Sequence, residues 1–295
     1  MSSDVEVLIV SYNSAEEIER CLASLRRAAP LLAVAVREHG NDAPALQALR
    51  AVLDAHPAPT RLEHDPANPG FGAGCNALAR SSRAELLLFL NPDAEVVVWP
   101  WSKDRPPPHG RVIGPVMSGP GRPEDHSGVS YRLRDEIARS WLRRRGRRPT
   151  GKGFVSGAAL MLDAASFDRL GGFDASYFMY YEDIDLCLRA NDAGIPTVIE
   201  PRWLVRHGRA HSTASRFGTA LVWSYESGSR FHASRGTPLA AYRAYVLADA
   251  VGRAGVHWLR GDRGSRRAYS DLARRVAGDL VRRRGLPGTA THPPV

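Results

Sequence analysis

Three acidic residues fall within four positions of the stretch MYYEDIDLCLRA, residues 179–190. Asp185 lies four residues before Arg189, so we expect these two side chains to pair on one face of a helix. Glu182 and Asp183 fall in the first turn of that helix, where the helix dipole favours ionised acids. An ionised carboxylate can also take the proton of an attacking hydroxyl. The stretch therefore indicates either ordinary charge at a helix end or a general base.

A second polar group follows the apolar run LLLFL. Asn91, Pro92 and Asp93 come directly after this run, so the Asp93 carboxylate should emerge at the carboxyl end of a buried strand, where open α/β sheets bind ligands. There it could hold Mg²⁺ or Mn²⁺ together with a diphosphate, or the three residues could simply end the strand as a turn. His207 closes a later apolar run and is either a structural histidine or a second metal ligand.

Three glycines stand close together in NPGFGAGCNALAR, residues 68–80. Gly70, Gly72 and Gly74 open an expected helix, and glycines there let backbone amides approach a phosphate or a sugar. The spacing differs from GxGxxG and no Walker lysine follows. A tight turn therefore explains these glycines as well as a ligand contact does.

Strands and helices must alternate to position these groups. Short apolar runs predict strands at residues 5–10, 31–36, 61–64, 86–90, 154–162 and 196–208. Helical periodicity predicts helices between the first four strands, and Ser14 with Glu17 predicts a capping box at the first of them. We therefore expect an α/β fold with a mostly parallel, Rossmann-like central sheet flanked by helices. After residue 211 the pattern is helical.

Composition limits the class of protein. The 295 residues are 43% hydrophobic and 24% charged, which suffices for a substantial core. The net charge is +9, and residues 251–295 hold ten arginines against three aspartates. The partner that this charge indicates is nucleic acid, a phosphorylated substrate or an acidic membrane surface; solubilising charge is the alternative.

The cysteines and the apolar runs bear on the cellular compartment. Cys21, Cys75 and Cys187 lie far apart without CxxC spacing, so neither a disulfide framework nor a zinc site is indicated. No run approaches the ~18 apolar residues of a membrane span, and the first residues lack a signal-peptide pattern. We expect a cytoplasmic protein, at most peripheral to the inner face of the membrane.

Five blocks taken together resemble the large family 2 of inverting glycosyltransferases, especially its rhamnosyltransferase-like bacterial members. The blocks are VLIVSYNSAEEIERCLASL, NPGFGAGCNALAR, LLLFLNPDAEV, GFVSGAALMLDAASFDRLGGFDASYFMYYEDIDLCLRANDAGI and EPRWLVRHG. The resemblance covers residues 5–211 and implies a GT-A fold, a nucleotide-diphosphate sugar donor and a divalent metal, Mn²⁺ or Mg²⁺. We expect residues 1–115 to bind the donor, residues 116–211 to bind the acceptor and carry catalysis, and residues 212–295 to form a basic helical extension.

The resemblance also implies roles for individual residues. Asp183 falls at the catalytic base, and Glu182 beside it would contact the acceptor or support that base. Asp93 would hold the metal on the donor diphosphate, with His207 as a further ligand. The expected donor-binding residues are Ser11, Tyr12, Asn13, Glu38, Asn68, Gly72, Asn76, Asn91 and Asp93. The expected acceptor-binding residues are Gly157, Tyr181 and Glu182.

Three features depart from the family pattern. VREHGND, residues 36–42, stands where the family has VDNxSxD, so Glu38 falls at the position of the Asp that contacts the nucleotide base or ribose. Asn91 replaces the first acid of the DXD-type motif. Residues 99–150 are rich in Pro and Arg. The nucleotide therefore stays open, and so does the acceptor, whether glycan, lipid-linked sugar or small natural product.

The resemblance favours single displacement from a donor such as dTDP-rhamnose, and other functions stay open. One is binding of nucleic acid or an anionic surface by the arginine-rich stretches 143–148 and 282–284. Few aromatic residues interleave with them, so no nucleic-acid partner is expected, but the basic end could rest on anionic lipid. Another is a family member that binds a nucleotide sugar without catalysis.

Overall fold

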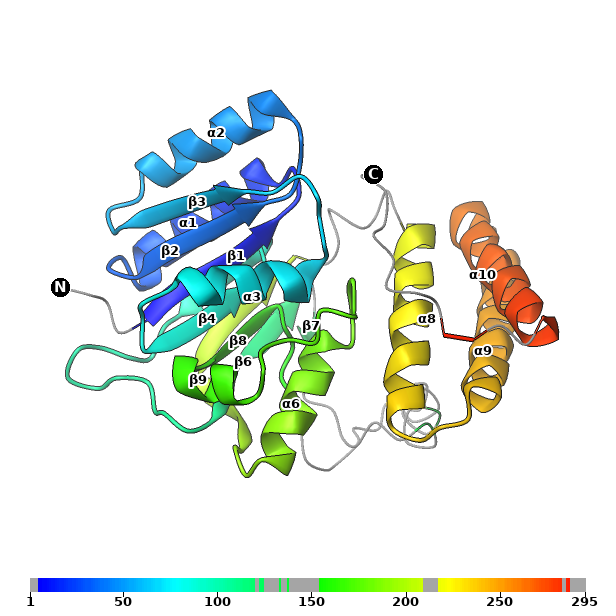
Figure 1. Cartoon of the computed structure of the whole chain (residues 1–295). Coiled ribbons are helices and arrows are strands. Elements are labelled where there is room, and N and C mark those ends of the chain that lie inside the picture. Colours follow the sequence, from blue (N-terminus) through cyan, green and yellow to red (C-terminus); the bar gives the residue numbers. More distant parts are fainter. Residues whose placement is uncertain are drawn as a thin grey trace.

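The computed structural model describes residues 5–119, 122–124, 133, 137, 154–208, 217–282 and 285–286. They form a central sheet with helices on both faces, and three long C-terminal helices stand beside the sheet (Figure 1). The arginine-rich stretch 143–148 and residues 283–284 lie outside the described residues.

The first four strands are parallel and adjacent. They are β1 (Val5–Ser11), β2 (Ala33–Glu38), β3 (Thr60–His64) and β4 (Leu86–Leu90), and the helices between them are α1 (Ala15–Ala28), α2 (Ala43–Asp54) and α3 (Phe71–Ser81). Their order is β3-β2-β1-β4. Because parallel strands end at the same edge, the loops after β1, β2 and β4 lie next to one another.

The second half of the sheet is mixed. It contains β5 (Ala94–Val98), β6 (Val112–Gly119), β7 (Arg122–Glu124), β8 (Ala159–Asp163) and β9 (Thr197–His207), with helices α5 (Ala164–Arg169) and α6 (Glu182–Asp192) before β9. β8 runs antiparallel between β4 and β6, β9 is parallel to β6, and β5 is the antiparallel edge strand. The α/β class is confirmed, and the expected parallel pairing holds for β1 to β4 and for β6 with β9.

Each face of the sheet has its own core. Alternating residues of β1 point to opposite faces, so Val7 packs with Ile18 and Leu22 of α1, whereas Leu8 packs on the face that α3 and α6 cover. Trp99, Trp101 and Trp203 meet edge to face, with ring centroids 4.7 to 5.7 Å apart, and fix the end of β5 against β9.

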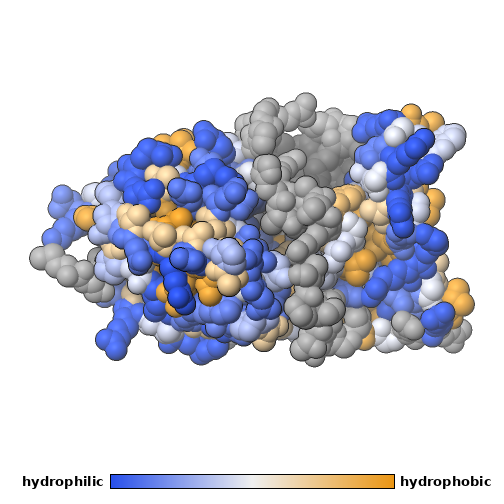
Figure 2. Space-filling model, turned by 90° about the horizontal axis from the view of Figure 1, so that it is seen from above, coloured by the Kyte–Doolittle hydropathy of each residue, from blue (hydrophilic) through white to orange (hydrophobic). Residues whose placement is uncertain are grey.

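The C-terminal helices are α8 (Phe217–Ser234), α9 (Leu239–Leu259) and α10 (Arg263–Val281). Tyr225, Tyr242, Leu272 and Val276 form a separate core among them. Seen from above, these helices show hydrophobic surface beside strongly hydrophilic surface (Figure 2). In the part of the chain that is described, no helix combines the length and the apolar character needed to cross a membrane.

Two local predictions are wrong. Ser14 does precede α1, but its Oγ donates to the Tyr12 carbonyl at 3.1 Å and makes no capping hydrogen bond, so the capping box is absent. The strand predicted at residues 154–162 begins only at Ala159. The preceding residues instead form a loop that enters the site.

Candidate active site

Glu38 joins the ends of the first two strands. Its side chain is buried, and its Oε2 accepts a hydrogen bond from Ser11 Oγ at 2.6 Å. Its Oε1 accepts from the backbone N–H groups of Asn13 and Gly40 at 2.8 and 2.5 Å. The two expected donor-binding residues Ser11 and Glu38 are therefore together, and their hydrogen bonds hold the loops after β1 and β2 in register.

The loop after β2 also contains a buried histidine that sequence reasoning missed. His39 is 1% exposed, and its Nδ1 lies 2.5 Å from the Asp65 carbonyl. Burial lowers the pKa of His39, so we assign a neutral ring that donates from Nδ1. A Cβ added at Gly74 would lie 3.0 Å from Nε2 of His39. A glycine at this position therefore lets α3 pack closely on the loop.

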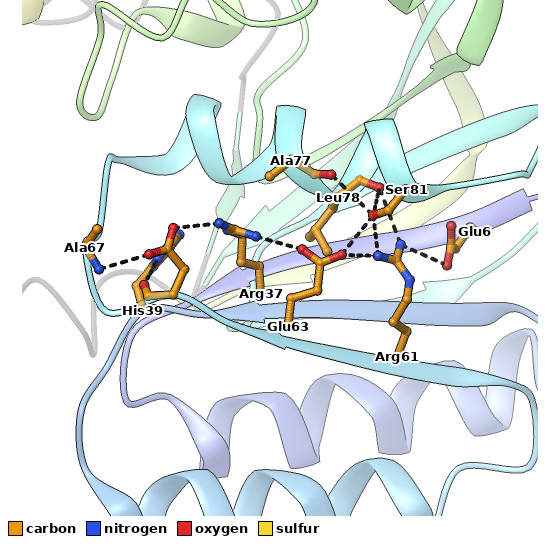
Figure 3. A network of polar contacts seen from close by, with 10 residues as sticks. Glu6, Arg37, His39, Arg61, Glu63, Ala67, Ala77, Leu78 and Ser81 are labelled. Atoms are coloured by element: carbon orange, nitrogen blue, oxygen red, sulfur yellow. Dashed lines mark hydrogen bonds and ion pairs between the residues drawn. The ribbon is translucent and has the colours of Figure 1, made fainter.

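Charged side chains on the α3 face of the sheet link β2 and β3 beside this loop (Figure 3). Arg37 donates to Glu63 at 2.7 Å and to Asp65 at 2.6 Å, and Arg61 donates to Glu63 and reaches Glu6 at 3.5 Å. The sequence alternates charged residues at positions 61, 63 and 65, and alternate strand residues share a face. This alternation could have predicted the charged network.

The glycines at the start of α3 serve close packing. Gly70 has φ +103°, and a Cβ there would lie 2.4 Å from the Phe178 carbonyl oxygen. A Cβ at Gly72 would lie 3.0 Å from Phe173 Cβ and 3.6 Å from Glu182 Cβ. Gly70 and Gly72 therefore pack against residues 173–182, whereas Gly74 packs against Val10 and His39, and none of these contacts requires a phosphate.

The remaining expected donor residues have different surroundings. Asn76 is committed to the fold, since its amide exchanges two hydrogen bonds with the Phe173 backbone at 2.8 and 2.9 Å. Asn68 adopts a left-handed conformation, φ 43°, in the turn before α3. Tyr12 is half-buried and Asn13 is exposed at the end of β1.

Asp93 and His207 meet at the edge of the sheet. Asp93 Oδ1 lies 3.2 Å from His207 Nε2, and Asn91 Nδ2 lies 3.5 Å from the same nitrogen. β5 and β9 pair so that Ala94 is opposite His207. A carboxylate and an imidazole at this distance are donors that Mn²⁺ or Mg²⁺ accepts. Among the described residues no group of three His, Cys, Asp or Glu could hold a metal.

Asp183 is held by two backbone amides at the start of α6. Its Oδ2 accepts from the Gly157 N–H at 2.8 Å, and its Oδ1 accepts from the Ile184 N–H at 2.8 Å. The side chain is half-buried and reaches solvent. A Cβ at Gly157 would lie 3.2 Å from Asp183 Cβ, which accounts for a glycine at this expected acceptor-binding position.

The two acidic positions flank one short backbone segment. Gly157 donates to Asp183, and the carbonyl of the next residue, Ala158, accepts from the Asn91 N–H at 2.9 Å. Asn91 begins the loop that carries Asp93. The base candidate and the metal candidate are thus linked through two adjacent residues, although they are 90 positions apart in the sequence.

Glu182 points inward. Its side chain is 5% exposed, and no described residue donates to its Oε2. Burial, and secondarily the charge of Asp183, raises the pKa of Glu182 well above its ordinary value. The raised pKa favours the protonated, uncharged form of this side chain, which packs near Gly72 of α3. Of its two expected roles, this position favours support of the base over contact with an acceptor.

The turn before α6 is strained. Tyr180 and Tyr181 have φ of 71° and 70°, a conformation that non-glycine residues rarely adopt and that costs about 1–3 kcal/mol each. Tyr181, an expected acceptor-binding residue, is the N-cap of α6, and its carbonyl accepts from the Asp185 N–H at 2.9 Å. The strain therefore sits directly before the base candidate.

Helix α8 holds this turn in place. Ser227 Oγ donates to the Met179 carbonyl at 2.8 Å, and the ring of Phe231 lies 5.2 Å from that of Tyr181. A Cβ at Gly228 would lie 1.9 Å from Tyr242 Oη and 3.1 Å from Tyr181 Cε2. The position of Asp183 therefore depends on contacts from Ser227, Gly228 and Phe231 of α8, which lie 44 to 48 residues downstream.

Comparisons with known proteins identify a family for the first part of the chain. Residues 6–97 match the family model Glycosyl transferase family 2. This segment belongs to that family. The family 2 segment includes β1 to β4 and contains Ser11, Glu38, Asn91 and Asp93. It ends before Asp183 and His207.

Two curated relatives of the family 2 segment are rhamnosyltransferases. N-acetylglucosaminyl-diphospho-decaprenol L-rhamnosyltransferase of Mycobacterium tuberculosis is 40% identical over 83 residues, which are 28% of this chain and 27% of that protein. Rhamnosyltransferase WbbL of Escherichia coli is 38% identical over 82 residues, or 28% of this chain and 31% of that protein. The matches thus cover less than a third of these relatives.

A solved structure shares the fold over most of the chain. Mannosyltransferase PcManGT from Pyrobaculum calidifontis, in complex with GDP-Man and Mn²⁺, has a TM-score of 0.57 and covers 96% of this chain and 88% of its own. At 15% identity this likeness shows the fold alone. The expected GT-A fold is confirmed.

The buried acid predicts a pH effect on stability. Above its ordinary pKa of 4.5, Glu182 loses its proton in the unfolded chain but keeps it in the folded protein, so folding becomes less favourable as pH rises toward the raised pKa. Glu182→Gln cannot ionise and should melt above the wild type at neutral pH by about 2 °C or more. The difference should vanish near about pH 4. Thermal melts from acid to neutral pH measure it, with the exposed Glu19→Gln as control. If Glu182→Gln melted below the wild type at neutral pH, the raised pKa of Glu182 would be contradicted.

The contact between α8 and the strained turn predicts a local effect. Gly228→Ala should destabilise the protein by about 1–3 kcal/mol, because the added methyl overlaps Tyr242. It should also speed hydrogen exchange at residues 178–187 relative to β1 and β4. Gly252→Ala, on α9 with no heavy atom within 4 Å of its Cβ, is the matched control. Unchanged exchange at residues 178–187 would show that α8 does not hold the turn.

Proposed function

We propose that this protein is an inverting glycosyltransferase that moves a sugar from a nucleotide-diphosphate donor to a hydroxyl acceptor. One observation carries the proposal: Asp183 on one side, and Asp93 with His207 on the other, are linked through residues 157–158. This arrangement lies at the edge where β1 and β4 end. A base and a diphosphate-binding group placed together are what sugar transfer needs.

Asp183 acts as the general base. As the acceptor oxygen attacks C1 of the sugar from the face opposite the diphosphate, Asp183 takes its proton. The bond from C1 to the diphosphate oxygen breaks, its electron pair leaves with the diphosphate, and the configuration at C1 inverts. The hydrogen bonds from Gly157 and Ile184 orient the carboxylate, and the raised pKa of Glu182 disfavours a second negative charge beside it.

Asp93 and His207 would hold the divalent metal. Mn²⁺ or Mg²⁺ bound there supplies charge that stabilises the departing diphosphate. Ser11, Glu38 and the loops that they join would frame the nucleotide. In this scheme residues 1–115 bind the donor, residues 116–211 bind the acceptor, and residues 212–295 form the extension.

The sugar that we propose is a deoxyhexose such as rhamnose, carried on dTDP. Its support is the 40% and 38% identity to two rhamnosyltransferases. The name of the first describes a lipid-linked acceptor, and we propose an acceptor of that kind here, with a glycan or a small natural product as the alternatives. A lipid-linked acceptor would place the enzyme in the cytoplasm, at the inner face of the membrane.

The base assignment has a direct test. Asp183→Asn should lower transfer from the donor about 10³-fold, while a thermal-shift screen of nucleotide sugars should show donor binding unchanged. Asp192→Asn, exposed on the same helix, should keep full activity. If Asp183→Asn kept full activity, Asp183 would not be the base. Tight donor binding without transfer to any acceptor would instead indicate a non-catalytic nucleotide-sugar-binding protein.

The metal ligands can be tested without turnover. Mn²⁺ should increase the thermal shift that the donor gives, because ion and diphosphate stabilise the folded protein together. Asp93→Ala and His207→Ala should each weaken the Mn²⁺ dependence by about tenfold or more, whereas neighbouring Glu95→Gln should not. An Asp93→Ala protein with wild-type Mn²⁺ dependence would remove Asp93 from the site.

A further inference from the structure

We propose that the α9–α10 hairpin docks on the surface of an anionic lipid bilayer. The apolar outer face of α9 and its last turn would enter the interface, and the arginines that follow would contact lipid headgroups. The hairpin stands on the far side of α8 from the sheet (Figure 1), so this surface is separate from the candidate active site.

The outer face of α9 is uncharged along its whole length. Its exposed residues include Ala241, Ala248, Val251, Val256, Trp258 and Leu259. The last three are 43%, 63% and 78% exposed, and Val251 is 57% exposed. Exposure of a contiguous apolar patch to water is unfavourable, and soluble proteins that carry such a patch usually use it to bind a partner or a membrane.

The titratable residues of α9 are turned away from this face or paired. Arg243 is 4% exposed and donates to Tyr225 Oη at 3.0 Å. Arg253 pairs with Asp249 at 2.6 Å. His257 Nδ1 lies 3.0 Å from Asp262 Oδ2. Because these charges are buried or paired, the apolar face can enter an apolar environment without burying an unpaired ion.

Positive charge borders the apolar surface. Residues 256–267 contain four arginines, at positions 260, 263, 266 and 267, and one acid, Asp262. All four arginines are exposed. Asp262 is occupied by the Ser265 N–H, which it caps at 3.0 Å, and by His257. The turn therefore presents unbalanced positive charge directly beside Trp258 and Leu259.

This combination fits a bilayer better than the other partners. Helices that lie in the interface carry Trp and Leu on one face and arginine on the other, and anionic lipid attracts the arginines. A second copy of this chain would bring like charges together across the patch. Nucleic acid would need aromatic residues interleaved with the arginines, and Trp258 is the one aromatic residue among positions 256–267.

Vesicle co-sedimentation of the full chain tests the proposal. The wild type should sediment with vesicles of phosphatidylcholine containing roughly one third phosphatidylglycerol and stay in solution with phosphatidylcholine alone. Trp258→Ser with Leu259→Ser should weaken binding about tenfold or more. The triple change of Arg263, Arg266 and Arg267 to Gln should weaken it about a hundredfold, at about fivefold for each arginine.

Matched variants control for lost surface and lost charge. Leu31→Ser with Val97→Ser removes two exposed apolar side chains from the first 115 residues, away from the hairpin. Leu31 is 78% exposed, as is Leu259. Arg27, Arg50 and Arg83 changed to Gln remove three exposed arginines from the same part. Both controls should sediment like the wild type. Equal losses in the controls and the hairpin variants would overturn the proposal.

Other results also decide against it. No sedimentation with either vesicle would overturn the proposal. So would tighter binding to a single-stranded oligonucleotide than to vesicles, or a dimer in light scattering that Trp258→Ser with Leu259→Ser converts to a monomer. Vesicle binding does not depend on the proposed function, whereas a link to a lipid-linked acceptor does. Thermal shifts with the donor, measured on the same variants, separate the two proposals, because the hairpin variants should bind the donor like the wild type.

Discussion

The hydrogen bonds made by residues 157 and 158 are the interactions on which the site depends. Gly157 N–H holds Asp183, and the Ala158 carbonyl holds the Asn91 N–H, so the loop between them fixes the base candidate relative to the loop that carries Asp93. This is possible because β8, which begins at the next residue, is inserted antiparallel beside β4. The mixed half of the sheet thus brings a late segment of the chain to the edge where the early parallel strands end.

Near this link the structure contains two locally unfavourable features, backbone strain and a buried polar atom. Tyr180 and Tyr181 occupy left-handed conformations, and Glu182 is buried with an oxygen to which no described residue donates. Such features persist only where neighbouring contacts over-determine them. Here those contacts come from α3, through the missing side chain of Gly72, and from α8, through Ser227 and Phe231. The strained turn therefore keeps its conformation only while the C-terminal helices stay packed against it.

Local patterns predicted most of the first half of the fold. The apolar runs of β1 to β4 and the pairing of Asp185 with Arg189, 2.7 Å apart, depend on neighbours in sequence, so they can be read from it. β6 was missed because Gly and Pro interrupt its sequence, VIGPVMSG, and weaken the strand signal. β5, AEVVV, was missed although its three valines favour a strand. Ser14 showed a cap signal, but its hydroxyl found the nearer Tyr12 carbonyl.

The sequence suggested residues for the candidate site but not the contacts that hold them. The resemblance suggested Asp183, Asp93 and His207, and the structure places Asp93 and His207 side by side. Nothing local could show that Asn76 is occupied by Phe173, or that α8 holds Tyr181, because these contacts join residues 50 to 97 positions apart.

The C-terminal helices have two different faces, and this explains their composition. α8 contributes small and aromatic residues, Ser227, Gly228 and Phe231, to the junction with α6, where close packing matters and charge would be costly. Among the described residues of the C-terminal helices, the exposed arginines gather on α10 and in the turn before it, on the far side of α8 from the sheet. A charge excess so separated from the candidate site needs its own physical cause, and the exposed Trp258 and Leu259 beside it point to an interface that is both apolar and anionic.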